Sequence, residues 1–525
     1  MATPARTYRC LYNHEMLICF TTQSPYQTYR EDVTRRQFEG YVRELSGTQV
    51  DALLCCPTAW RLPLYPSAVD PRWTTAATTE AEPPAEADRR YYDKVYWRVR
   101  RTMLTGVDPL AITLATAREV GLGCFLSYRM NDHHYLNRPD CPTHPRFWRE
   151  HPELRIAPAA GNHHLDYLRP EVRDWYARIL QELLDRYDVD GLELDFMRGP
   201  TYFAANRVAE GMPVMTAFVR DLRRRLDEVG RQRGRRLLLG VRVQRNLALC
   251  ESTGLDVRTW DREGLVDMVN ASPFYLHSAD VDIEGLKREL HRARVYGEMH
   301  FITRPGRTPG GFANNIHRYT TPTQYETCAL SFLDRGADGV SLFNFAYTRD
   351  HHFGEPRRRE YPGWEPPWAV LGHIADEGYL RSRPKHYHKI PVYPADPGDK
   401  GALPMTIGAG RTGGTRLYIA DRLEPGHPFA RALLRLESDV PIVGIPVQVA
   451  VNGKALTPTH GLGELFAPFA PEAIPHYENL LFFEVPLGSL TRGWNELSIR
   501  HPGAGAYESQ ALCLAAIELA LYTRT

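Results

Sequence analysis

The sequence predicts an α/β protein in which a (β/α)8 TIM barrel is followed by a C-terminal, jelly-roll-like antiparallel β-sandwich. Apolar strand patterns alternate with helical patterns over the first part of the chain, which is typical of a parallel barrel wrapped by helices. Nearer the C-terminus the pattern changes to short alternating segments joined by turns, as in a sandwich. We therefore assign residues 1–385 to the barrel and residues 386–525 to the sandwich.

Eight segments have the composition of barrel strands, and helical periodicity fills the gaps between them. The strands are predicted at Arg9–Phe20, Val50–Pro57, Gly123–Asn131, Gly191–Arg198, Leu237–Asn246, Val266–Pro273, Val295–Ile302 and Gly339–Phe345. The helices are predicted at Arg35–Leu45, Pro109–Val120, Pro170–Tyr187, Pro213–Arg233, Ile283–Arg294 and Thr321–Arg335. A doubly wound open sheet is the alternative, but it usually carries a glycine-rich loop after its first strand, and Cys10–Glu15 is not such a loop.

The region after residue 385 has the turn chemistry of an antiparallel protein. Residues 389–414 are rich in proline and glycine and predict an irregular entry. Asn452 and Gly453 stand between two strand patterns, which is a strong hairpin signal. The sandwich strands are predicted at Thr415–Asp421, Arg431–Leu436, Ile445–Val451, Leu480–Val485, Asn495–Arg500 and Leu512–Tyr522.

Composition argues against several classes of protein. Lys plus Arg is 64 and Asp plus Glu is 63, so no global field favours nucleic acid or an anionic membrane as a partner. No run of about 18 apolar residues predicts a transmembrane helix, and the N-terminal residues lack the apolar core of a signal peptide. The nine cysteines are scattered through the chain, which favours reduced thiols and a cytoplasmic location.

The predicted fourth strand, Gly191–Arg198, carries two acids at alternate positions, Glu193 and Asp195. Alternate residues of a strand share a face, so the two carboxylates point one way while Leu192 and Leu194 point the other. Buried acids without partners are costly. We therefore expect them to face a shared cavity, and an ion-paired structural role is the alternative.

Other strands carry polar residues toward their carboxyl ends, where a barrel places its active site. In the seventh strand Glu298 and His300 share one face, and in the first strand the inward member of Asn13, His14 and Glu15 stays open. This mixture of acids, amides and arginines suits a polyhydroxylated ligand, although some members will only satisfy the barrel interior. The predicted ligand-binding residues are Asn13, Arg129, Asn131, Asp132, His133, Arg198, Arg242, Gln244, Asn270, His300 and Asn344.

The helix–strand unit around the two acids has a recognisable pattern. A Pro-Glu-Val-Arg-Asp helix start at residues 170–174 leads into Asp-Gly-Leu-Glu-Leu-Asp at residues 190–195. This resembles the family-10-like group of TIM-barrel glycoside hydrolases, over about residues 5 to 380, and implies hydrolysis of glycosidic bonds. In the better-studied retaining clan the fourth strand ends in Asn-Glu, whereas here it ends in Leu194-Asp195, which leaves the acid/base assignment open.

Glycoside hydrolysis generally needs two carboxyl groups that flank the scissile bond. Our hypothesis pairs Asp195 with Glu298, and Asp132 is the alternative partner of Asp195. Glu193 would orient Asp195 or pair with Arg242 or Arg129. No cofactor is expected for this chemistry.

Additional residues refine the expected ligand. Arg198 and Arg349 are candidates for binding a substrate carboxylate. Trp60, Tyr135 and Trp148 are candidates for stacking on sugar faces.

Two other functions compete with a glycosidase that acts on a carbohydrate substrate. Three His-His pairs, 133–134, 163–164 and 351–352, suggest a metal-dependent barrel hydrolase or isomerase. A non-catalytic carbohydrate-binding barrel is the other rival. The long segment Leu62–Arg100 would be a lid or the contact of a homo-oligomer, with a mobile middle over residues 74–88.

Overall fold

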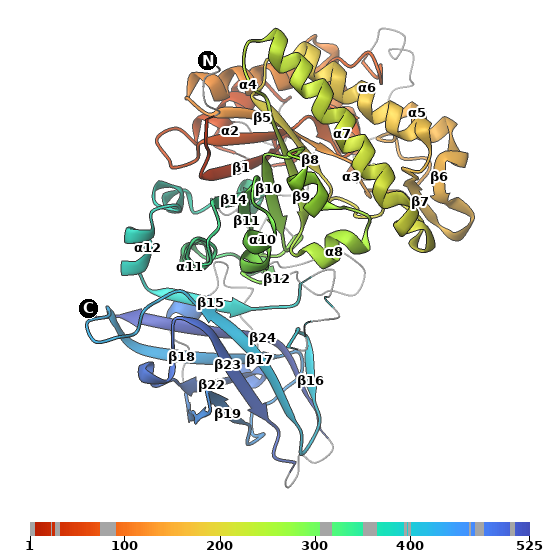
Figure 1. The fold of residues 1–525 in the computed structure, drawn as a ribbon. Coiled ribbons are helices and arrows are strands. Elements are labelled where there is room, and N and C mark those ends of the chain that lie inside the picture. Colours follow the sequence, from red (N-terminus) through yellow and green to blue (C-terminus); the bar gives the residue numbers. More distant parts are fainter. Residues whose placement is uncertain are drawn as a thin grey trace. The chain divides into compact units, whose positions relative to one another are not determined.

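The computed structural model contains a closed barrel of eight parallel strands and a pair of C-terminal antiparallel sheets (Figure 1). It describes residues 6–22, 24–26, 32–73, 91–304, 318–349, 365–392, 396, 399, 401–460, 464–467, 477–503 and 510–524. Residues 74–88, His351 and His352, which bear on the expected lid and the third histidine pair, lie outside the described residues. The predicted fold class is confirmed.

All eight predicted barrel strands are present. They are β1 (Cys10–Glu15), β2 (Ala52–Cys56), β5 (Gly123–Arg129), β8 (Gly191–Asp195), β9 (Leu238–Gln244), β10 (Met268–Ser272), β11 (Arg294–His300) and β14 (Gly339–Phe343), in the closed order β1-β14-β11-β10-β9-β8-β5-β2. The first strand is shorter than predicted, because the apolar run continues as a short helix, α1 (Ile18–Thr21). Short apolar runs fit either structure.

The remaining helices are α2 (Arg35–Arg43), α3 (Tyr91–Leu104), α4 (Pro109–Glu119), α5 (Arg146–Glu150), α6 (Pro170–Arg186), α7 (Val208–Gln232), α8 (Leu247–Ser252), α9 (Val257–Arg262), α10 (Ile283–Glu289), α11 (Pro322–Asp334) and α12 (Glu377–Ser382). The six predicted helices are present with shifted ends as α2, α4, α6, α7, α10 and α11, and α3, α5, α8, α9 and α12 were not predicted. Start signals are visible: Asp108 caps α4, and Thr321 with Gln324 forms a capping box at α11. Helix α7 begins before Pro213, the residue at which the sequence predicts its start.

Aspartates at the strand starts tie the lower ends of neighbouring barrel strands together. Asp51 accepts the backbone N–H groups of Arg9 and Cys10 at 2.7 and 3.1 Å. Asp190 accepts from Cys124, and Asp267 accepts from Leu239, both at 2.8 Å. These charge-assisted bonds satisfy backbone N–H groups that would otherwise lack a partner. They also hold neighbouring strands in register, which aligns the residues at the carboxyl ends of the strands.

The inward faces of the barrel strands change character from bottom to top. Leu11, Leu54, Phe125, Leu238 and Met268 belong to one apolar cluster. On β1 and β5 the next inward residues are polar, Asn13 and Ser127, and the ones after them are charged, Glu15 and Arg129, since alternate residues share a face. Polar chemistry is therefore gathered at the carboxyl ends of the strands.

Gly191 shows why the lowest layer closes well. A Cβ atom at this position would lie 2.7 Å from a ring carbon of Phe125 and 2.2 Å from the carbonyl oxygen of Leu238. The glycine therefore leaves room for the Phe125 ring beneath Glu193 and Asp195.

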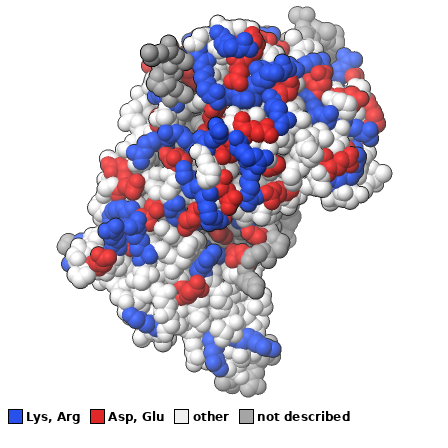
Figure 2. Space-filling model, in the orientation of Figure 1, with Lys and Arg blue, Asp and Glu red and all other residues white. Residues whose placement is uncertain are grey.

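The outer surface of the barrel is charged but balanced. Helix α7 carries Arg220, Arg224 and Arg225, which pair with Glu263 or Asp221. Figure 2 shows basic and acidic residues interspersed on the face where α7 lies in Figure 1. Within the described residues, no helix is both long and apolar enough to cross a membrane.

The C-terminal strands form two antiparallel sheets around an apolar core. One contains β15 (Lys385–Lys389), β24 (Leu512–Thr523), β18 (Phe429–Ser438), β22 (Leu480–Glu484), β21 (Thr457–Thr459) and β16 (Met405–Ile407). The other contains β17 (Thr412–Ile419), β23 (Gly493–Arg500), β19 (Gln448–Val451) and β20 (Lys454–Ala455). Asn452 and Gly453 have φ of 49° and 78° between β19 and β20, as the hairpin signal predicts.

By internal contacts the chain divides into two compact units. The first comprises Met1–Ser272, Glu284–Tyr296 and Ser341–Pro366, and the second comprises Pro273–Ile283, Gly297–Val340 and Pro367–Thr525. Strands β11 and β14 therefore contribute residues to both units.

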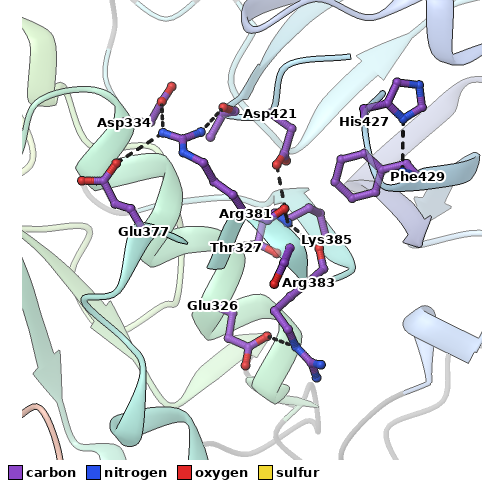
Figure 3. A network of polar contacts seen from close by, with 12 residues as sticks. Glu326, Thr327, Asp334, Glu377, Arg381, Arg383, Lys385, Asp421, His427 and Phe429 are labelled. Carbon is purple, nitrogen blue, oxygen red and sulfur yellow. Dashed lines mark hydrogen bonds and ion pairs between the residues drawn. The ribbon is translucent and has the colours of Figure 1, made fainter. Parts of the chain in front are cut away.

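Ion pairs in the second unit join helices α11 and α12 to sandwich strands. Asp334, at the end of α11, accepts from Arg381 at 2.7 Å and from Arg492 at 2.5 Å. Lys385 of β15 lies 3.5 Å from Asp421, and Arg383 lies 3.9 Å from Glu326 (Figure 3). The helices and the strands of this unit are thus linked by charge as well as by packing.

Candidate active site

Asp195 stands at the carboxyl end of β8, in the uppermost layer of the barrel interior. Its side chain is 3% exposed. Nη1 of Arg242 donates to Oδ1 at 2.9 Å, and the backbone N–H of Met197 donates to the same oxygen at 2.8 Å. Within the described residues Oδ2 makes no hydrogen bond, so one carboxylate oxygen is held while the other is open for chemistry.

Arg242, on the neighbouring strand β9, is fully buried and orients Asp195. Its second donor group reaches Oγ of Ser272 on β10 at 3.1 Å, and its guanidinium lies 3.8 Å above the ring of Phe343. A buried guanidinium is stable only beside an opposite charge. The guanidinium therefore fixes the direction of the Asp195 carboxylate from the neighbouring strand.

Glu193 lies one layer below Asp195 and belongs to a network of neutral polar groups. Ser127 of β5 donates to it at 2.7 Å, and Asn270 of β10 donates at 3.3 Å. Asn270 also donates to Ser341 of β14, and Asn13 of β1 donates to Ser127. The network positions Glu193 beneath Asp195, whereas the expected pairing partner Arg242 donates to Asp195 itself.

A chain of charged groups lies at the ends of β1 and β5. Arg129 donates to Glu15 and, at 2.8 Å, to Asp132. Asp132 lies 2.6 Å from Nδ1 of His134, and Arg198 donates to Nε2 of the same ring at 3.0 Å. Because Nε2 accepts, the ring proton of His134 resides on Nδ1 and points at Asp132.

The charges of these neighbouring side chains determine whether the carboxyl groups of Glu15 and Asp132 are protonated. Burial by itself would raise the pKa of Glu15, but Arg129, Arg198 and His134 hold it below its ordinary value. In the same way, His134, Arg129 and Arg61 outweigh burial and hold the pKa of Asp132 well below its usual range. Both acids are therefore ionised, and neither is suited to donate a proton near neutral pH.

Glu298 and His300, on β11, form a buried pair of their own. Nε2 of His300 lies 2.8 Å from Oε1 of Glu298, and both side chains are fully buried. The backbone carbonyl of His300 accepts from Nδ1 of His277 at 3.0 Å and from the hydroxyl of Thr320 at 2.8 Å. These residues belong to the second compact unit.

The first strand resolves which of its polar residues face inward. Asn13 and Glu15 make the interior contacts described above, while the ring of His14 lies near Tyr41 of α2, with centroids 6.1 Å apart. Glu15 was not among the predicted ligand-binding residues. The alternation from Leu11, an apolar core residue, was the signal that could have identified it.

Several predicted residues have structural partners at the same end of the barrel. The Asn131 amide donates to the carbonyls of Leu165 and Thr201, and the Gln244 amide donates to Leu249 and Thr253. Burial lowers the pKa of His133 to about 3, so this ring is neutral. Arg349 is held by Glu44 and Glu365 and anchors the segment after β14.

Two buried amide oxygens are open toward a ligand. Oδ1 of Asn13 and Oδ1 of Asn344 have no hydrogen-bond partner within the described part of the chain. Asn344 directly follows β14 in a left-handed conformation, with φ of 56°. Buried acceptors are normally satisfied, so these two oxygens mark places where hydroxyl groups of a ligand would be favourable.

Aromatic side chains follow the neighbouring strands β2 and β5. Trp60 and Tyr135 both have φ of 56°, and their rings meet edge to face with centroids 5.1 Å apart. Left-handed conformations of bulky residues cost about 1–2 kcal/mol each and cluster at functional sites. The pair adjoins His134, whose ring centroid lies 6.0 Å from that of Trp60.

The histidine pairs do not assemble a metal centre among the described residues. No group of three or more His, Cys, Asp or Glu side chains there is arranged to hold an ion. His134 is engaged by Asp132 and Arg198, and His164 lies 3.0 Å from the side chain of Asn162.

Comparison with known proteins finds similarity only to solved structures, at low sequence identity. No family model and no curated protein sequence matches it. It is similar to the chitinase ChiW from Paenibacillus sp. str. FPU-7, with 12% identity, a TM-score of 0.41, and coverage of 94% of this chain and 52% of that one. It is also similar to α-L-fucosidase isoenzyme 1 from Paenibacillus thiaminolyticus, with 13% identity, a TM-score of 0.36, and coverage of 94% and 97%.

A β-galactosidase from the psychrophilic Marinomonas ef1 is a further match, with 10% identity, a TM-score of 0.42, and coverage of 71% of this chain and 59% of that one. The chain spans about half the length of the chitinase. Likeness at this level does not identify an activity or a substrate, and the family-10-like resemblance is not confirmed by it.

Proposed function

We propose that this protein is a glycoside hydrolase in which Asp195 and Glu298 are the two reacting carboxyl groups. The observation that supports the proposal is the hydrogen bonding of the Asp195 carboxylate. One of its oxygens is fixed by Arg242 and Met197, and the other is uncommitted among the described residues. A carboxylate held in this way at the end of a barrel strand is suited to attack an anomeric carbon or to activate a water molecule.

The two acids have partners suited to different roles. Arg242 holds one oxygen of Asp195 and leaves the other to face a substrate. Glu298 is paired with His300, a group that can itself gain and lose a proton. We assign Asp195 as the nucleophile or base and Glu298, supported by His300, as the donor of the proton to the glycosidic oxygen.

The surroundings of Asp195 suit a sugar. Unsatisfied amide oxygens on Asn13 and Asn344 would accept hydrogen bonds from hydroxyl groups. Trp60 and Tyr135 supply aromatic surface close by. Ligand pockets commonly combine apolar walls with a few convergent polar groups.

The role assignment predicts different substrate dependence for two variants. Glu298→Gln removes the proton donor, so hydrolysis of an unactivated glycan falls by about 10²–10⁴-fold. Hydrolysis of a dinitrophenyl glycoside, whose leaving group needs no proton, is largely retained. Asp195→Asn loses both activities. Initial rates on the two substrate types measure the difference.

Asp185→Asn, an exposed acid on α6, is the matched control and keeps wild-type rates on both substrates. Equal losses on both substrates for Glu298→Gln would overturn its assignment as proton donor. Near-wild-type turnover by Asp195→Asn would overturn the proposed mechanism altogether.

A further inference from the structure

Two partly buried arginines, Arg61 and Arg155, lie near the end of β5. Arg61 contacts Nδ1 of His144 at 3.1 Å and the backbone carbonyl of Asp132. Arg155 donates to the backbone carbonyl of Trp148 at 2.6 Å. Within the described residues neither guanidinium lies within ion-pair distance of a carboxylate, whereas Arg129, Arg242 and Arg349 each do.

The partner of Arg61 is electrically neutral. Nε2 of His144 faces the carbonyl oxygens of Tyr135 and Arg138 at 3.1 and 2.9 Å, so the ring proton resides there and Nδ1 accepts from Arg61. Burial, together with Arg61, lowers the pKa of His144 to about 4. Arg61 therefore makes its direct contacts with dipoles, and the carboxylate of Asp132 attracts it only from beyond ion-pair distance. A charge compensated in part becomes more favourable when a further anion approaches it.

Both arginines lie against one indole ring. The guanidinium of Arg155 is 3.6 Å from the centroid of Trp148, and that of Arg61 is 5.5 Å from it. Stacking on Trp148 holds the guanidinium planes without using their hydrogen-bond donors. Donor groups thus remain for a ligand.

A small cavity opens beside Arg61. Its lining includes Trp60, Arg61, Arg129, Asp132, Trp148 and Tyr176. The cavity has room for one or two water-sized groups beside Arg61, which is enough to admit one end of a carboxylate. The carboxylate of Asp132 at its wall attracts Arg61 but is engaged directly by Arg129 and His134, so it compensates the charge of Arg61 only in part.

The cavity lies next to the strand that carries Asp195. Arg129, one of its lining residues, is the register partner of Asp195 across β5 and β8. A sugar ring that presents its anomeric carbon to Asp195 would place its substituents near the end of β5. This placement depends on the proposed glycosidase function.

We propose that the Arg61 cavity is a subsite for the carboxylate of an acidic sugar, so that the substrate is a uronate-containing glycan. Arg61 supplies the charge, and its planar donors match the two oxygens of a carboxylate. A sulfate ester has the same charge but three terminal oxygens, which the planar pair of guanidinium donors matches less closely than the two oxygens of a carboxylate.

Binding measurements on the full-length Asp195→Asn protein test the proposal without turnover. Isothermal titration with methyl β-D-glucuronide, methyl β-D-glucoside and glucose 6-sulfate compares three substituents on similar rings. We expect the glucuronide to bind at least about tenfold more tightly than the glucoside, since a hydrogen bond to a charged group contributes about 1.5–3 kcal/mol. Equal affinity for these two, or tighter binding of the sulfate, would overturn the proposal.

Arg61→Gln in the same background reduces the glucuronide affinity to the level of the glucoside affinity. Arg146→Gln, which removes an arginine that is 73% exposed and paired with Glu150, is the matched control and leaves the preference intact. Wild-type preference in Arg61→Gln would contradict the assignment. If Arg61→Gln does not fold, as judged by circular dichroism, the comparison of the three ligands decides alone.

The outcomes separate the two proposals. Preferential glucuronide binding by a protein that hydrolyses no glycoside would reject the glycosidase and retain the acidic-sugar subsite. Hydrolysis of neutral glycans, without preference for the glucuronide, would reject the subsite and retain the glycosidase.

Discussion

At the scale of single residues, the candidate site depends on how each acid is partnered. Asp195 is paired with Arg242, Glu193 with neutral Ser127 and Asn270, and Glu298 with His300. Three other strands, β5, β9 and β10, thus contribute to placing the acids of β8 alone. The acids could be named from sequence because alternation puts Glu193 and Asp195 on one face, but their partners come from distant segments that spacing does not reveal.

Arg242→Lys tests this partnership. Lysine keeps the charge but cannot hold Asp195 and Ser272 with one planar fork, so the carboxylate loses its fixed direction. We expect kcat on a hydrolysed substrate to fall by about 10²-fold, the effect of a misplacement of about 1 Å. Arg223→Lys, at a buried arginine paired with Asp227 and Asp267, is the control and keeps the kcat of the folded protein. An unchanged kcat for Arg242→Lys would show that the fork does not position Asp195.

At the scale of elements, the sequence predicted the positions of the barrel strands well and the residues at which they end less well. The eight strands were visible because buried parallel strands are continuous apolar runs. The end of β1 was missed because Ile18–Thr21 is as apolar as the strand before it. Arg61 could not be recognised as a ligand-binding residue, since its contact with His144 joins segments 83 residues apart.

The ion pairs of α11 make stability depend on pH in the second unit. Burial by itself would raise the pKa of Asp334, but Arg492, Arg381 and Tyr418 hold it below its ordinary value of 3.8. A depressed pKa stabilises the fold above that ordinary value, and this stabilisation is lost as the pH falls through the folded-state value. We expect Asp334→Asn to lower the free energy of unfolding by about 1–2 kcal/mol at pH 7, and by progressively less below about pH 4.

Urea unfolding between pH 3 and 7 measures this difference. Glu377→Gln removes a 44% exposed partner of Arg381 at 3.3 Å and is the control, with an expected change under about 1 kcal/mol. A destabilisation of Asp334→Asn that stays constant down to the acid limit would rule out the ionised Asp334 as its source.

At the scale of the whole molecule, the barrel confines reactive chemistry to one end. Aspartates tie the lower strand ends, an apolar cluster fills the lower interior, and charged side chains occupy the upper layer. This gradient could be predicted in outline from the polar residues at strand ends. The sequence does not show which of those residues contact a ligand and which only stabilise the barrel, because that depends on which oxygen each amide presents to the interior.

The most direct test of the account is a screen for reducing sugar released from neutral and uronate-containing oligosaccharides, with wild-type protein and Asp195→Asn in parallel. The account predicts release by the wild type, with preference for a uronate-containing glycan, and a loss of at least about 10³-fold in Asp195→Asn. Release that is equal in both proteins, or absent from both across the panel, would contradict it.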